Sequence, residues 1–85
     1  MKTAIADYIL CLSTPTNYAN DRPLLEKYLA HAAVLLAMVE KGDSLDKIKQ
    51  KILDHDRLLS QTWLEGPEYK KIYQAFEQVK SMAGI

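Results

Sequence analysis

His55 stands between two aspartates in the run Asp54-His55-Asp56, and His31 is the other histidine of the chain. A histidine and a carboxylate together can bind a divalent metal or transfer a proton in acid–base catalysis. Consecutive helical residues point about 100° apart, so these three side chains cannot all face one ion. Metal sites use three or four ligands, and two histidines supply too few. We therefore expect both histidines to be structural, and we predict no metal, no cofactor and no catalytic residue.

Cys11 is the only cysteine, so no disulfide can form within the chain. A thiol becomes a nucleophile when a nearby base or positive charge lowers its pKa. Both histidines are distant in sequence, and free cysteines are among the most buried residues, so we expect Cys11 to pack in the core. A small domain without a disulfide is typical of a reducing compartment, which predicts a cytoplasmic protein. The longest apolar run, residues 30–39, is too short to span a bilayer, and we expect no membrane contact.

Five lysines form the basic clusters of the chain: Lys47, Lys49, Lys51, Lys70 and Lys71. Eleven Lys and Arg balance eleven Asp and Glu, whereas nucleic-acid binders usually carry a positive excess. The segments around Gly42 could be read as a helix-turn-helix, but Asp46 lies where the recognition helix would meet DNA. We expect these lysines to be solvated and nucleic acid not to be the partner. A nucleic-acid-binding regulator that uses them is the alternative hypothesis.

Large apolar and aromatic side chains gather around Gly66-Pro67, and one tyrosine lies in a polar loop. Trp and Tyr dominate the energetics of protein interfaces because each buries a large area and has one polar group. The same residues could instead hold two helices together at a corner. The candidate interface residues are Tyr18, Trp63, Leu64 and Tyr69.

Apolar residues recur at helical spacing throughout the chain, and no stretch alternates as a strand would. Pro15, Gly42 and Gly66-Pro67 divide the chain into four segments. The predicted helices are residues 2–12, 22–41, 44–64 and 67–82. Short connections at the two glycines favour antiparallel neighbours. The sequence therefore predicts one all-α domain over residues 1–85, a small compact bundle of about four helices.

Helix 22–41 has the clearest boundaries and the most apolar surface. Pro23 suits a first turn, Gly42 suits a closing residue, and Asp43 or Ser44 can cap the following helix. Apolar residues extend almost around the cylinder of helix 22–41, which predicts that it is the central helix of the bundle. Two or three small neighbours would not cover all of this surface.

The predicted function is that of a non-catalytic helical module that binds another protein or a second copy of itself, as an adaptor, inhibitor or regulator. The surplus apolar surface of helix 22–41 is the positive indication for this function. The composition, 48% apolar and 26% charged, is that of an ordinary globular domain. A metal-dependent or acid–base enzyme centred on His31 and His55 is the least supported reading. It requires the two histidines to meet in the fold, which the sequence leaves open.

Overall fold

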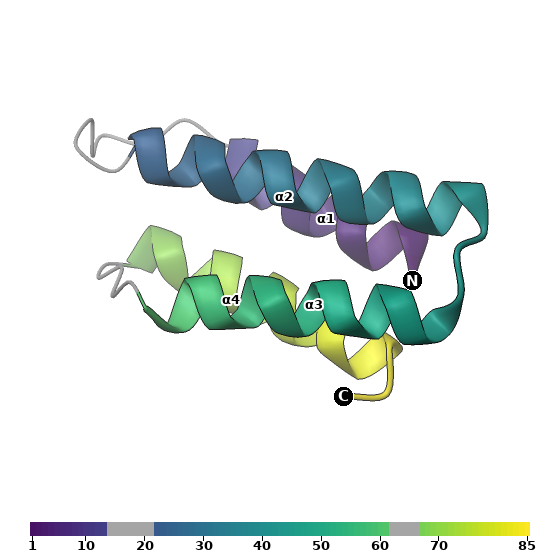
Figure 1. Cartoon of the computed structure of the whole chain (residues 1–85). Helices are drawn as coiled ribbons and strands as arrows, with labels where there is room; N and C mark the ends of the chain where they lie inside the picture. Colours follow the sequence, from purple (N-terminus) through teal and green to yellow (C-terminus); the bar gives the residue numbers. More distant parts are fainter. Residues whose placement is uncertain (14–21, 62–66) are drawn as a thin grey trace.

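The computed structural model of the chain describes residues 1–13, 22–61 and 67–85. These residues form four α-helices and no strand: α1 (Lys2–Ser13), α2 (Arg22–Lys41), α3 (Leu45–Ser60) and α4 (Pro67–Met82). Each helix runs antiparallel to the next, with α1 and α2 above α3 and α4 in Figure 1. The prediction of a small all-α bundle is confirmed. Among the described residues, no helix combines the length and apolar character that a bilayer crossing requires.

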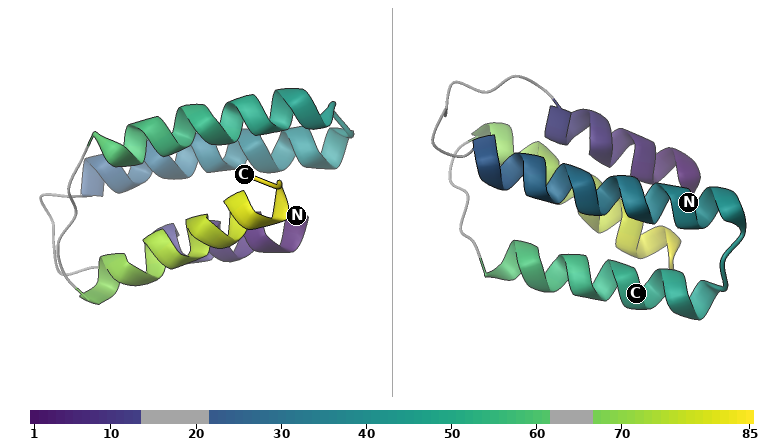
Figure 2. Two further views of the ribbon diagram at one scale, coloured as in Figure 1. Left: turned by 90° about the horizontal axis from the view of Figure 1, so that it is seen from below. Right: turned by 45° about the horizontal axis from the view of Figure 1, so that its top comes forward.

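The backbones approach most closely in three helix pairs, α1–α2, α1–α4 and α2–α3. The bundle is 37 Å long and 19 by 18 Å across, and both ends of the chain lie in the half nearer the turn between α2 and α3 (Figure 2). Side chains therefore supply most of the contact between α3 and the α1–α4 pair. The large residues at the centre of the bundle fill this space.

The helix boundaries agree with the predicted ones to within one residue, apart from the end of the third helix. Ser44 caps α3 by accepting a hydrogen bond from the backbone nitrogen of Lys47 at 3.4 Å. The helix ends at Ser60, and the next backbone nitrogen, that of Gln61, donates to the carbonyl of Arg57 at 3.2 Å. The predicted extension to residue 64 falls outside the described residues from position 62 onward.

The core lies where the apolar stripes of the four helices meet. Its most deeply buried large side chains come from every helix: Ile5 and Tyr8, Tyr28 and Leu35, Ile52 and His55, and Tyr69, Phe76 and Val79. The sequence predicted that helix 22–41 is the central helix of the bundle, and this prediction is wrong. Helix α2 is one of four helices that surround the core. Its inner face is buried at Leu25, Tyr28, Ala32 and Leu35, and its opposite face is exposed.

Gly42 closes α2 as the sequence predicted. Its φ of 77° lies in the left-handed region, where a side chain strains the backbone. The Gly42 nitrogen donates to the carbonyl of Val39 at 3.2 Å, and the Asp43 nitrogen donates to that of Met38 at 3.0 Å. This pair of bonds is a Schellman motif, which ends the helix and turns the chain toward α3.

We expect the substitution Gly42→Ala to lower the free energy of unfolding by about 1 kcal/mol. A Cβ at this position would meet no atom within 4 Å, so the cost is that of the left-handed backbone alone. Chemical denaturation followed by far-UV circular dichroism measures it. Gly42→Asn is the matched control and should cost less, because asparagine tolerates this conformation. Equal losses in the two variants would contradict this explanation.

Candidate functional site

His55 lies at the centre of the bundle and touches an aromatic residue of each of the other three helices. It follows Ile48 and Ile52 on the buried stripe of α3, and its side chain is 2% exposed. The His55 ring centroid lies 5.4 Å from that of Tyr8 on α1, 5.8 Å from Tyr28 on α2 and 5.2 Å from Phe76 on α4. One side chain therefore joins all four helices.

A buried hydrogen bond links Tyr8 to His55. The Tyr8 hydroxyl lies 2.5 Å from Nε2 of His55, and 47 positions separate the two residues in sequence. Tyr8 is fully enclosed, so neither group can exchange this partner for water without opening the bundle. A buried polar group that lost its partner would cost about 1–3 kcal/mol, which makes this bond a strong constraint on how α1 and α3 pack.

The other ring nitrogen of His55, Nδ1, is buried and has no hydrogen-bond partner among the described residues. If the Tyr8 hydroxyl donates to Nε2, the neutral ring carries its proton on Nδ1 as an unpaired donor. If Nε2 donates instead, Nδ1 is an unpaired acceptor. Each tautomer leaves one polar atom unsatisfied in the core. The site is thus polar, enclosed and incompletely paired.

Burial also determines the charge state of both partners. The pKa of His55 is lowered to about 4, mainly by burial and to a smaller extent by the neighbouring His31 and Lys51, against a smaller opposing effect of Asp56. Burial likewise raises the pKa of Tyr8 above its ordinary value, with smaller contributions from nearby tyrosines and Cys11. Near neutral pH the pair therefore consists of an uncharged imidazole and an uncharged phenol.

The two histidines, whose meeting the sequence left open, come together in the fold. The ring centroids of His31 and His55 lie 6.1 Å apart. His31 is half-buried on α2, and its Nδ1 lies 3.4 Å from Nζ of Lys51 on α3. Among the described residues, no group of three or more His, Cys, Asp or Glu side chains could hold a metal ion. The prediction of no metal site rested on ligand number and stays a prediction.

The aspartates beside His55 point away from it, as helical geometry predicts. Asp54 is exposed and accepts a hydrogen bond from the Gln50 side chain at 3.1 Å. Asp56 pairs with Lys80 of α4 at 3.5 Å, which links α3 to α4 at the edge of the bundle. The chemistry of the central cluster therefore belongs to Tyr8, His55 and His31. Tyr8 and His55 are buried, and the hydrogen bond between them holds α1 and α3 together.

Of the four candidate interface residues, the structure describes one. Tyr69 is 2% exposed and belongs to the core, so it offers no surface to a partner. The other three candidates, Tyr18, Trp63 and Leu64, lie outside the described residues. Cys11 is half-buried and packs against the core, in the position expected of it.

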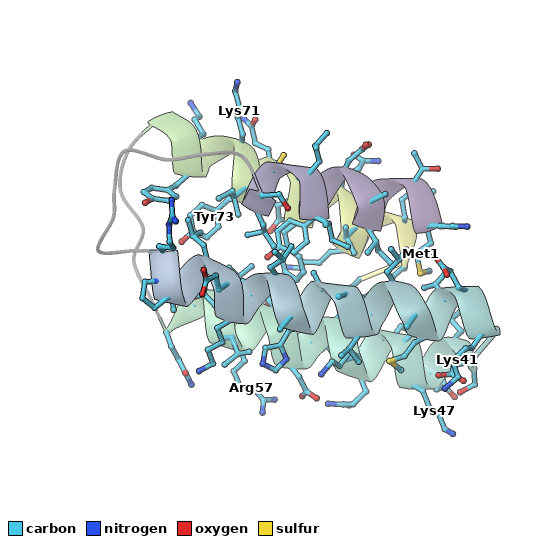
Figure 3. The ribbon with its side chains drawn as sticks, turned by 90° about the horizontal axis from the view of Figure 1, so that it is seen from above. Met1, Lys41, Lys47, Arg57, Lys71 and Tyr73 are labelled. Atoms are coloured by element: carbon cyan, nitrogen blue, oxygen red, sulfur yellow. The ribbon has the colours of Figure 1, made fainter. Side chains whose placement is uncertain are left out.

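The five candidate lysines do not gather on one surface. Lys51 faces α2 through His31, whereas Nζ of Lys49 lies beside Gly84 at the end of α4. Lys47 and Lys71 are exposed on opposite sides of the bundle (Figure 3). Lys70, also exposed, precedes Lys71 in the first half of α4. Helical phase separates lysines that stand close together in the sequence.

The sequence predicted surplus apolar surface on helix 22–41, but it did not predict that residues of α1 would extend this surface. On α2, four exposed residues follow the spacing i, i+3, i+4 and i+7, and on α1 two more are exposed. We call this surface the α1–α2 face; it consists of Ala30, Ala33, Val34, Ala37, Ala6 and Leu10. The spacing on α2 is legible in the sequence, but helix 22–41 carries two apolar stripes. Periodicity does not tell which of them faces inward.

No family model, no curated protein and no solved structure matches this chain. The site has to be interpreted from its own residues.

We expect Tyr8→Phe to lower the free energy of unfolding by about 1–3 kcal/mol, because it leaves Nε2 of His55 buried without a partner. His55→Leu should also be destabilising, since it strands the Tyr8 hydroxyl. The double variant Tyr8→Phe/His55→Leu removes both polar groups and should be more stable than the sum of the two losses predicts. Urea denaturation of the four proteins measures this coupling.

Tyr28→Phe is the matched control for this cycle. It removes a hydroxyl that donates to the carbonyl of Leu58 at 3.2 Å, so it should be less damaging and should not couple to His55→Leu through a lost hydrogen bond. If Tyr8→Phe costs less than Tyr28→Phe, the Tyr8–His55 bond does not have the importance assigned to it.

Proposed function

We propose that this protein is a non-catalytic binding module that recognises an apolar α-helix of a partner protein through the α1–α2 face. The exposure of this face supports the proposal. Leu10 is 69% exposed and Val34 is 50% exposed, and four exposed alanines accompany them. Contiguous apolar surface on a small domain commonly marks a site of protein interaction.

The two halves of the face adjoin one another. Nζ of Lys2 lies 3.9 Å from a carboxylate oxygen of Glu40, which brings the start of α1 beside the end of α2. The helices are antiparallel neighbours, and each rises by the same amount per residue. Eight residues further along α1, Leu10 therefore lies near the level of residues 32–33, beside Ala33.

On α2, charge is absent from the middle of the face and present at its ends, whereas α1 exposes Asp7 between Ala6 and Leu10. The sequence has no Asp, Glu, Lys or Arg between Lys27 and Glu40. The exposed side of α3 instead mixes charges at Asp46, Lys47, Asp54 and Arg57 with the apolar Leu45 and Leu53. An apolar centre with a charged rim is the usual anatomy of a protein interface.

The shape expected of this surface favours a helix as the occupant. Alanines at Ala30, Ala33 and Ala37 leave a shallow strip on α2 and allow another backbone to come close. Larger side chains, Leu10 and Val34, border the strip. A partner helix with bulky apolar residues at i, i+3, i+4 and i+7 would pack into it, a common mode of peptide recognition.

The charges support a protein partner in preference to a nucleic acid. Each end of the α2 strip carries one acid and one base, Glu26 with Lys27 and Glu40 with Lys41, which suits a helix with mixed charges and not a polyanion. The scattered lysines of α3 and α4 give no continuous phosphate track. The formal net charge of zero also permits a second copy of the chain to supply the helix.

We expect the double substitution Ala33→Glu/Ala37→Glu to abolish partner binding and leave the fold intact, because both positions are exposed and glutamate is a good helix former. A photoreactive residue at position 34 should give a discrete covalent adduct in native lysate, with a helical segment at the crosslinked site. The glutamates should reduce the adduct at least tenfold, equivalent to about 1.4 kcal/mol. Mass spectrometry identifies the crosslinked segment.

The control variant is Gln74→Glu/Gln78→Glu, which adds the same charge at the same spacing on exposed positions of α4. It should leave the adduct from position 34 unchanged, and a photoreactive residue at position 78 should give no comparable adduct. Adducts of equal yield from both positions, or an adduct that survives the glutamates at 33 and 37, would contradict the proposal. An adduct of the chain with itself would identify the partner as a second copy.

A further inference from the structure

The boundary between α3 and the α1–α4 pair depends mainly on side chains for its packing, and His55 lies on this boundary. The backbone of α3 approaches α2 closely, but α1 and α4 are reached from α3 mainly through large residues in the core. His55 provides the hydrogen bond to Tyr8 on α1 and the ring contact to Phe76 on α4. The Asp56–Lys80 ion pair lies at the edge of the same boundary. Few polar interactions besides these join α3 to the α1–α4 pair in the described residues.

A proton on His55 would meet no compensating group inside the bundle. Nδ1 has no acceptor within reach among the described residues, and the Tyr8 hydroxyl at Nε2 is uncharged. The nearest basic neighbours, His31 and Lys51, would oppose the new charge. Asp56 favours the protonated ring, but its effect is the smallest of these, and its carboxylate is already paired with Lys80. The titratable groups around His55, helix by helix, are Tyr8 on α1, Tyr28 and His31 on α2, Lys51 and Asp56 on α3, and Lys80 on α4.

We propose that proton uptake by His55 opens the bundle between α3 and the α1–α4 pair, so that mild acid exposes the core of this protein. Burial of an unpaired imidazolium is strongly unfavourable, and opening this boundary lets water solvate it. The close α1–α2 contact and the short turn at Gly42 do not involve His55, and the backbones of α2 and α3 also approach each other directly. The helices therefore persist while their packing loosens.

The direction of the pH effect follows from the pKa of His55, which is about 4 in the folded protein and 6.5 in an unfolded chain. Between these values the open or unfolded chain binds the proton and the closed bundle does not. Stability is complete above about pH 6.5 and is lost as the pH falls toward 4. Most carboxylates remain ionised above pH 5, so the interval from pH 6.5 to 5 isolates the histidine contribution.

Two measurements test this proposal. In the wild type, the equilibrium constant for unfolding should rise about 15-fold between pH 6.5 and 5, and the near-UV tyrosine signal should be lost at higher pH than the far-UV helical signal. His55→Leu removes the titrating group and should abolish most of the 15-fold change. The matched control His31→Gln changes the adjacent histidine and should keep at least half of it. A His55→Leu protein as acid-sensitive as the wild type would overturn the proposal.

An NMR titration of the wild-type His55 ring does not depend on any variant folding. We expect the ring to remain unprotonated in the closed bundle down to about pH 4.5 and to take up its proton together with the loss of near-UV signal. Proton uptake near pH 6.5 with the tyrosine signal intact would show that the closed bundle accepts the charge, and the proposal would fail.

Discussion

The hydrogen bond between Tyr8 and His55 is the constraint on which the arrangement of the four helices depends. An apolar core tolerates small shifts and rotations of its helices, because hydrophobic attraction has no direction. The hydrogen bond between a buried phenol and imidazole is directional, so it restricts how the two helices that carry them can shift or rotate. Since Tyr8 lies on α1 and His55 on α3, diagonally across the bundle, their bond fixes the relative height and rotation of helices whose backbones do not touch closely.

The rest of the fold fits around this pair. Tyr28 and Phe76 enclose the His55 ring from α2 and α4, and Tyr28 turns its own hydroxyl to a backbone carbonyl of α3. The inner face of α2 therefore packs against the aromatic residues at the centre of the bundle. Its alanine-rich face is left pointing outward beside Leu10. The same interaction that orders the core thus determines which apolar surface remains available for a partner.

The sequence predicted the local structure well, because helix periodicity and end signals act over a few residues. Gly42 ends α2 and Ser44 caps the start of α3 where their chemistry predicts, and the stripe through Ile48, Ile52 and His55 is buried. The sequence did not predict the pairing of Tyr8 with His55, because 47 residues separate them and side-chain direction selects the partner. Nor did it predict that the second apolar stripe of α2 stays exposed, because it placed this helix at the centre of the bundle. That depends on helices elsewhere in the chain.

A proton–proton nuclear Overhauser spectrum of the wild-type protein at neutral pH tests most directly whether His55 joins the four helices. The ring protons of His55 should give cross-peaks to the rings of Tyr8, Tyr28 and Phe76 at once, because ring centroids lie within 6 Å in all three pairs. These cross-peaks would establish that one histidine joins all four helices. A His55 ring with cross-peaks to water and to none of these aromatics would contradict the central claim.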